Sequence, residues 1–184
     1  MKKFAIAMLT ALSFGAFAAD YVSVAVDHVT NRGDSSKSTV QYVRAGKEIN
    51  GIQYGLQSRT ARADDASGLY SSLEGYVGKN YSVAGMTVSP FVGAGRDLTK
   101  NGANEPFTYG LIGATVGKPM FGGYAMAGVK TRSGTTAASE TKQTVTFASY
   151  AYPVAKSVSL VAGVSRSAQD IKERAVSIGV QVGF

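Results

Sequence analysis

The only histidine of the chain, His28, is the side chain best able to exchange a proton near neutral pH. Asp27 precedes it, and Thr30 follows two positions later. Adjacent side chains on a β-strand point to opposite faces, so Asp27 and His28 would be separated, whereas His28 and Thr30 would share a face. A hydroxyl beside a histidine base is an arrangement for nucleophilic catalysis. The plainer interpretation of His28 is a side chain at the depth of lipid headgroups.

Charged residues on the small, polar faces of predicted strands form a second group of candidates. They are Asp27, Arg59, Glu74, Lys130 and Arg132. Inside a membrane barrel, such residues would line the lumen, where a charged constriction selects ions. The alternative is a paired network that fills the lumen, because buried charges need partners and small barrels are packed with side chains. Either arrangement predicts a narrow pore at most.

Composition excludes several other kinds of site. The chain has 184 residues, one histidine, no cysteine and a net charge of +7. Thiolate zinc sites, disulfide scaffolds and multi-histidine metal clusters are therefore excluded, and we expect no metal and no cofactor. The chain is too apolar and too aromatic for disorder. Its positive charge is modest and unclustered, so we expect no nucleic-acid partner.

The N-terminus has the three parts of a secretory signal peptide. Lys2 and Lys3 form a positive start, an apolar stretch covers residues 4–17, and Ala16-Phe17-Ala18 is a cleavage site of the A-x-A kind. The apolar stretch is shorter than the roughly 20 residues of a membrane-spanning helix. We predict a signal peptide over residues 1–18 and one exported domain over residues 19–184.

The exported part alternates apolar and polar residues with a period of two. In 174–184, Val176, Ile178, Val180 and Val182 alternate with small or polar residues, which predicts a strand with one apolar face. Nine further segments follow this pattern: 21–30, 39–46, 52–60, 69–78, 86–97, 108–117, 124–132, 144–152 and 158–167. The faces of 39–46, 108–117 and 144–152 stay unassigned. We predict ten strands, or eight if two weak segments are lost.

The connections between these segments alternate in length. Longer polar connections cover 31–38, 61–68, 98–106, 133–140 and 168–173, and shorter ones cover 47–51, 80–85, 118–123 and 153–156. A barrel that crosses a membrane carries loops on one rim and tight turns on the other. The polar faces have few of the lysines and glutamates of a solvated surface. Together these features predict an all-β, up-and-down antiparallel transmembrane β-barrel.

With these elements, the chain resembles the small bacterial outer-membrane β-barrels of the OmpA/OmpX type. The segment Pro90-Phe91-Val92-Gly93-Ala94-Gly95 is similar to a strand common in such barrels, and the last strand ends in an aromatic residue. The resemblance implies an outer-membrane location with both termini in the periplasm, and contact with membrane lipids and lipopolysaccharide. It also implies a monomer whose last strand is recognised by the barrel-assembly machinery, through Val180, Val182 and Phe184. The leading function is structural, with at most a narrow, low-conductance pore.

Two weaker resemblances concern enzymes, although we expect no enzymatic activity. The stretch His28-Val29-Thr30-Asn31 is similar to the His-x-Ser-Asn motif of the PagL lipid A deacylases, with threonine in place of serine and in the first strand instead of near the C-terminus. This resemblance implies a lipid A esterase. Asp27-His28 and Asp64-Asp65 are similar to the acidic and Asp/His pairs of the omptin proteases, which are much longer chains.

The last alternative is a surface interaction protein that acts through its loops. Arg32-Gly33-Asp34 has the sequence that engages integrins in some surface proteins. An adhesin of this kind would use the loops at residues 31–38 and 98–106. The basic loop residues suggest contact with lipopolysaccharide phosphates, because phosphates attract cations: Arg32, Lys37, Lys100, Lys172 and Arg174.

Overall fold

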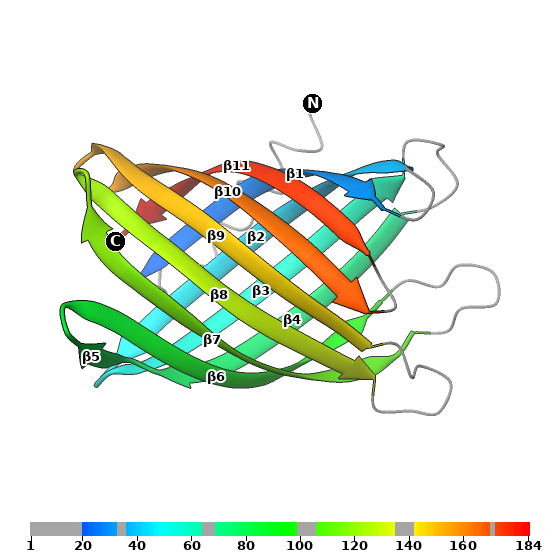
Figure 1. The fold of residues 1–184 in the computed structure, drawn as a ribbon, viewed down its shortest axis with the longest axis horizontal. Helices are drawn as coiled ribbons and strands as arrows, with labels where there is room; N and C mark the ends of the chain where they lie inside the picture. The colour runs from blue at the N-terminus through cyan, green and yellow to red at the C-terminus, as the bar shows by residue number, and fades with distance from the viewer. Residues whose placement is uncertain (1–19, 33–35, 64–68, 99–105, 135–141, 170–171) are drawn as a thin grey trace.

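The computed structural model describes residues 20–32, 36–63, 69–98, 106–134, 142–169 and 172–184. The predicted signal peptide therefore lies outside the described residues. Ten long strands make up the fold (Figure 1): β1 Tyr21–Asn31, β2 Lys37–Ile49, β3 Ile52–Ala63, β4 Leu69–Lys79, β6 Met86–Asp97, β7 Thr108–Met120, β8 Gly123–Gly134, β9 Lys142–Ala155, β10 Val158–Gln169 and β11 Glu173–Gly183. The described residues include no helix that is long and apolar enough to span a membrane.

The ten long strands form a closed ring. Each pairs in antiparallel fashion with the long strands before and after it in the chain, and β1 pairs with β11 from Tyr21–Gly183 to Asn31–Glu173. Closure leaves no unpaired edge, which is the requirement for a sheet in lipid. The predicted up-and-down barrel of ten strands is confirmed, and the alternative of eight is wrong.

One short strand, β5 (Tyr81–Val83), was not predicted. It lies in the connection between β4 and β6, which the sequence analysis treated as a plain turn over 80–85, and it pairs with the start of β6. Its three residues are too few for an alternating pattern to be recognised. Because β4 pairs directly with β6, β5 takes no part in the closed ring. It lies at the end of the barrel where short turns join the strands.

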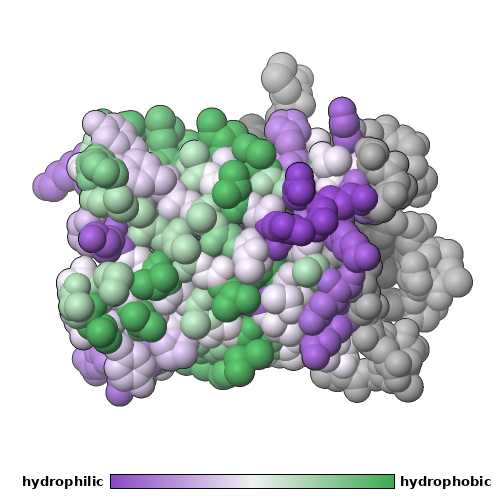
Figure 2. Space-filling view, viewed as in Figure 1, coloured by the Kyte–Doolittle hydropathy of each residue, from purple (hydrophilic) through white to green (hydrophobic). Residues whose placement is uncertain are grey.

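The wall is one sheet thick, so alternate side chains of each strand point into the lumen and the others point outward. Glu74 is 2% exposed and Gln57 is 8% exposed, whereas Ile112 is 62% exposed and Ile178 is 67% exposed. Buried polar residues such as these lie inside and the most exposed aliphatic residues lie outside, although Val29, Val40, Ala61 and Ala175 form a small apolar cluster in the lumen. This arrangement suits a wall that faces lipid. Figure 2 shows hydrophobic residues spread over the middle of the wall.

Tight turns join three pairs of strands at one end of the barrel, the turn end. Asn50-Gly51, Ala84-Gly85 and Phe121-Gly122 all have positive φ at both residues. Two such residues between antiparallel strands form a type I′ turn, whose twist matches that of the strands. Positive φ is unfavourable for alanine and phenylalanine. The sequence signals these turns mainly through the glycine in each pair.

Several glycines make room for an aromatic ring on the neighbouring strand. A Cβ atom on Gly55 of β3 would overlap the ring of Tyr76 on β4, its partner in the strand register. Gly46 and Tyr21 form an equivalent pair on β2 and β1. In each pair the tyrosine ring covers the backbone that the glycine leaves bare. These pairs fix the local register, because a slip of one residue would place a side chain under the ring.

The pair of Gly55 and Tyr76 gives a first prediction. Gly55→Val is expected to lower the free energy of unfolding by about 1–3 kcal/mol, because the added methyl groups displace the Tyr76 ring. Urea unfolding in phospholipid vesicles, followed by circular dichroism, measures the change. Gly75→Ala is the matched control, since a Cβ there meets nothing within 4 Å. Equal unfolding curves for Gly55→Val and the native chain would contradict the overlap.

Candidate functional site

Glu74 on β4 is the centre of the polar lumen. Its carboxylate forms ion pairs with Lys130 Nζ at 2.7 Å and with Arg132 at 2.5 Å, both on β8. The Tyr109 hydroxyl on β7 donates a hydrogen bond to Glu74 Oε1 at 2.9 Å. In the ring, β6 and β7 separate β4 from β8. The ion pairs therefore cross the lumen instead of joining adjacent strands.

Hydrogen bonds extend this cluster around the lumen. Arg44 Nε on β2 donates to Gln57 Oε1 on β3 at 2.8 Å, and Gln57 Nε2 donates to Glu74 Oε2 at 3.4 Å. On the other side, Arg132 donates to Gln143 Oε1 on β9 at 2.8 Å. We call these seven side chains the Glu74 network: Arg44, Gln57, Glu74, Tyr109, Lys130, Arg132 and Gln143. The network connects six of the ten long strands.

Asp27 and Arg59 belong to a second group in the lumen. Asp27 on β1 is 6% exposed, and Tyr42 on β2 lies near enough to both Asp27 and Arg59 to interact with them. Arg44 lies near enough to Asp27 to interact with its charge, and Glu173 interacts similarly with Arg59. Arg44 thus links this group to the Glu74 network.

The structure places all five predicted lumen charges inside the barrel. Three of them, Glu74, Lys130 and Arg132, are brought into direct contact, and Asp27 and Arg59 meet through Tyr42. Whether these charges have a role in ion selection stays a prediction. The arrangement matches the paired network that was the alternative to an open charged constriction.

Sequence reasoning missed four members of the Glu74 network: Arg44, Gln57, Tyr109 and Gln143. Arg44, Tyr109 and Gln143 lie on β2, β7 and β9, and the predicted segments for these strands had unassigned faces or began one residue too late. The strand register would have revealed Arg44, because it stands opposite Gln57. Gln57 lies within the predicted strand 52–60 but was not considered as a partner for Glu74.

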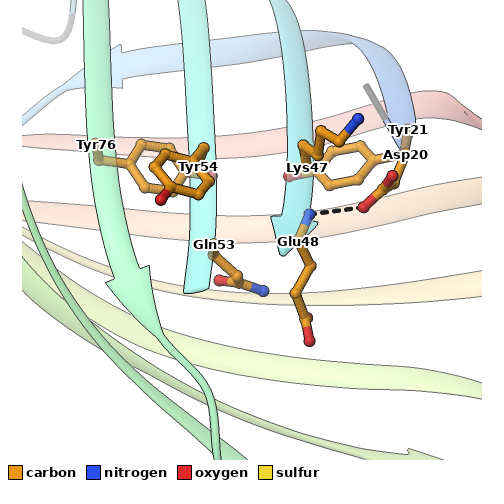
Figure 3. Close-up of a pocket in the computed structure, with 7 residues that line it drawn as sticks. All are labelled: Asp20, Tyr21, Lys47, Glu48, Gln53, Tyr54 and Tyr76. Atoms are coloured by element: carbon orange, nitrogen blue, oxygen red, sulfur yellow. Dashed lines mark hydrogen bonds between the residues drawn. The ribbon is translucent and has the colours of Figure 1, made fainter. Parts of the chain in front are cut away.

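Tyr21 and Tyr76 lie on the inner face of the wall near the turn end, whereas Tyr54 is 47% exposed on the outer face. A cavity of about 230 Å³ lies at this end, lined by Asp20, Tyr21, Lys47, Glu48, Gln53, Tyr54 and Tyr76. Figure 3 shows these residues at the ends of neighbouring strands, with the Glu48 backbone N–H donating to Asp20 Oδ2 at 2.6 Å. Asn80 Nδ2 donates to the Glu48 carboxylate. Hydrogen bonds thus connect the start of β1 to the turn before β6 and stiffen this rim.

His28 lies on the outer face of β1. It is exposed, as is Thr30, whereas Asp27 and Val29 are buried. Its partners in the strand register are Val176 on β11 and Thr39 on β2, so neither neighbouring strand places a carboxylate opposite it. This position agrees with a histidine at headgroup depth. Asp64 and Asp65, the other half of the omptin resemblance, lie outside the described residues.

The predicted assembly signal lies on the strand that closes the ring. Val180 and Val182 are partly exposed on the outer face of β11, opposite Val24 and Val22 of β1, and Phe184 is 61% exposed. Recognition of this strand by the assembly machinery stays a prediction, as does the monomeric state. In the loops proposed for adhesion, Gly33, Asp34 and residues 99–105 lie outside the described residues.

No group of three or more histidine, cysteine, aspartate or glutamate residues within the described ranges could hold a metal ion. The polar contacts described in the lumen are ion pairs and hydrogen bonds of carboxylate, guanidinium, ammonium, amide and hydroxyl groups. Such groups can close a channel or position water and small ions.

The fold has counterparts among solved structures, although no family model and no curated protein matches the sequence. The transport unit of the autotransporter AIDA-I from Escherichia coli is 11% identical, with a TM-score of 0.52, over 97% of each chain. The translocator domain of the autotransporter NalP from Neisseria meningitidis is 11% identical, with a TM-score of 0.51, over 100% of this chain and 96% of that one. Outer membrane phospholipase A from Escherichia coli is 10% identical, with a TM-score of 0.51, over 91% and 92%. These similarities show the fold alone, which is that of outer-membrane β-barrels.

Proposed function

We propose that this chain is an integral protein of the bacterial outer membrane with a structural role, and that its lumen is closed or nearly closed by the Glu74 network. The supporting observation is the pair of ion pairs from Glu74 to Lys130 and Arg132, which cross the lumen from β4 to β8. An open pore keeps its charges along the wall and leaves water between them. Here oppositely charged side chains meet across the lumen.

The barrel is also small enough for side chains to close it. Interiors of barrels near eight strands are filled by side chains, and ten strands add little width. Tyr21 and Tyr76 occupy part of the inner face at the turn end. Any remaining route for ions runs between paired charges, so its conductance would be low. This proposal includes no enzymatic activity, and the exposed position of His28 fits a contact with headgroups.

Single-channel recording tests the proposal. The exported chain, residues 19–184, is refolded and inserted into a planar bilayer, and heat-dependent gel mobility shows that it has folded. We expect silence or rare small steps from the native chain. The double variant Glu74→Ala/Lys130→Ala removes the carboxylate that both bridges share, together with one of its two cations, and is expected to give larger and more frequent steps. Large regular steps from the native chain, unchanged in the double variant, would reject a lumen closed by this network.

A further inference from the structure

A row of four polar residues, three of them basic, crosses four adjacent strands on the outer wall, near the end opposite the tight turns. Arg166 on β10 pairs in register with Arg174 on β11, and Arg174 pairs with Thr30 on β1. Thr30 in turn pairs with Lys37 on β2. All four residues are exposed. Their neighbours along the chain, Val29, Ser167 and Ala175, are buried in the lumen. The row therefore points away from the barrel.

Arg32 adds a further cation to this row. It follows the end of β1, and its backbone N–H donates to the carbonyl of Lys172 at 2.7 Å, just before β11. The guanidinium of Arg166, followed by a loss of hydration and by the guanidinium of Arg174, lowers the pKa of Arg32 below its usual range, although Arg32 itself is exposed. Positive charge thus accumulates here. We call Arg32, Lys37, Arg166 and Arg174 the arginine patch.

The described residues offer no carboxylate to balance the patch. Glu173 is next to Arg174 in the chain, but it faces the lumen, where it interacts with Arg59. The ion pairs of Glu74 also lie inside the barrel. Like charges directly opposite one another on a sheet destabilise it, so the Arg166–Arg174 pair gains most from an external anion.

The wall next to the patch is apolar. Two residues from Arg166 and Arg174 along the strands are Val164 and Val176, which are 56% and 63% exposed, and Ile178 follows at 67%. Two residues of a strand cover roughly 7 Å. Figure 2 shows hydrophilic residues gathered over the loop-side ends of β10 and β11, beside hydrophobic residues on the middle of the wall. Cations and aliphatic side chains are thus arranged as the headgroup and the acyl chains of one lipid.

We propose that the arginine patch binds the phosphorylated headgroup of lipopolysaccharide, with its acyl chains lying along Val164, Val176 and Ile178. The proposal rests on the outer-membrane location given under Proposed function. Guanidinium groups bind phosphate through two parallel hydrogen bonds, and two facing arginines can hold one phosphate between them. A free phosphate ion would use the arginines and leave the aliphatic wall unused, so the adjacent apolar wall favours the lipid.

Lipid binding by the refolded chain in detergent micelles tests the proposal, with diphosphoryl lipid A, its dephosphorylated form and inorganic phosphate as probes. Native mass spectrometry counts the bound molecules. We expect the native chain to retain diphosphoryl lipid A at least about 10-fold more tightly than the dephosphorylated lipid, a difference of about 1.4 kcal/mol. Arg166→Gln/Arg174→Gln is expected to remove this preference. Lys79→Gln/Lys118→Gln, which removes two exposed cations near the turn end, is expected to keep it.

Three results would overturn the proposal. They are equal binding of both lipids, an undiminished preference in the arginine double variant, and full competition by millimolar inorganic phosphate, which would show a site for the free ion. Gel mobility confirms folding of each variant before binding is measured. The patch is outside the lumen, so the arginine double variant should conduct as the native chain does. Failure of lipid binding and failure of the closed lumen are therefore observed separately.

Discussion

Replacing Glu74 by glutamine is expected to lower the free energy of unfolding of the barrel by about 3 kcal/mol, because it leaves two buried cations without their counter-ion. The Glu74 side chain is 3% exposed, and those of Lys130 and Arg132 are 16% and 15% exposed. Glutamine keeps the size and the hydrogen-bonding capacity of the side chain, so the loss reports the charge. Urea unfolding in phosphatidylcholine vesicles, followed by circular dichroism, measures it.

A double-mutant cycle separates this ion pair from general damage. Lys130→Gln alone leaves Glu74 paired with Arg132, and the variant with both changes removes one cation together with the anion. We expect the double variant to lose less stability than the sum of the two single variants, by about 1 kcal/mol or more. Additive losses would show that Glu74 and Lys130 do not interact in the folded barrel.

Ile112→Arg is expected to lower the free energy of unfolding by about 2–4 kcal/mol, because it places a charge on the lipid-facing wall near mid-membrane. Ile112 is 62% exposed and lies near the middle of β7, between the exposed Val92 and the partner Thr131. In a water-soluble barrel the same substitution would cost little, since an exposed arginine is well hydrated. The result thus tests both that the barrel is inserted in a membrane and that the Ile112 face of β7 points toward lipid.

Lys118→Arg is the matched control for Ile112→Arg. It lies on the same strand and the same face, six residues nearer the turn end, and it is already charged and exposed. We expect no measurable change in stability. The loss of stability caused by Ile112→Arg should also differ between detergent and vesicles, whereas Lys118→Arg should cause no loss in either. If Ile112→Arg left the free energy of unfolding in vesicles unchanged, this face would lie outside the hydrocarbon layer.

The strands themselves were predictable because a two-residue period is a local property of the sequence. The segment predicted over 86–97 has the bounds of β6, and the others differ from their strands by a few residues. The predicted bounds were least accurate where the pattern was weak: β9 runs from Lys142 to Ala155, whereas the prediction was 144–152. Short β5 and the type I′ turns at Ala84 and Phe121 carry little signal, since one depends on three residues and the others on an unfavourable φ.

The sequence by itself determined the class of fold and the presence of charges on the polar faces. Alternation states which residues share a face, so Glu74 and Lys130 could each be assigned to the lumen from neighbours along their own strands. Their meeting could not be predicted, because they are 56 residues apart and are joined only when the ring closes. Closure and strand stagger also brought Arg166 opposite Arg174 on the outer wall. Only the tertiary structure decided these contacts, because side-chain period is local whereas register around a barrel is a property of all ten strands together.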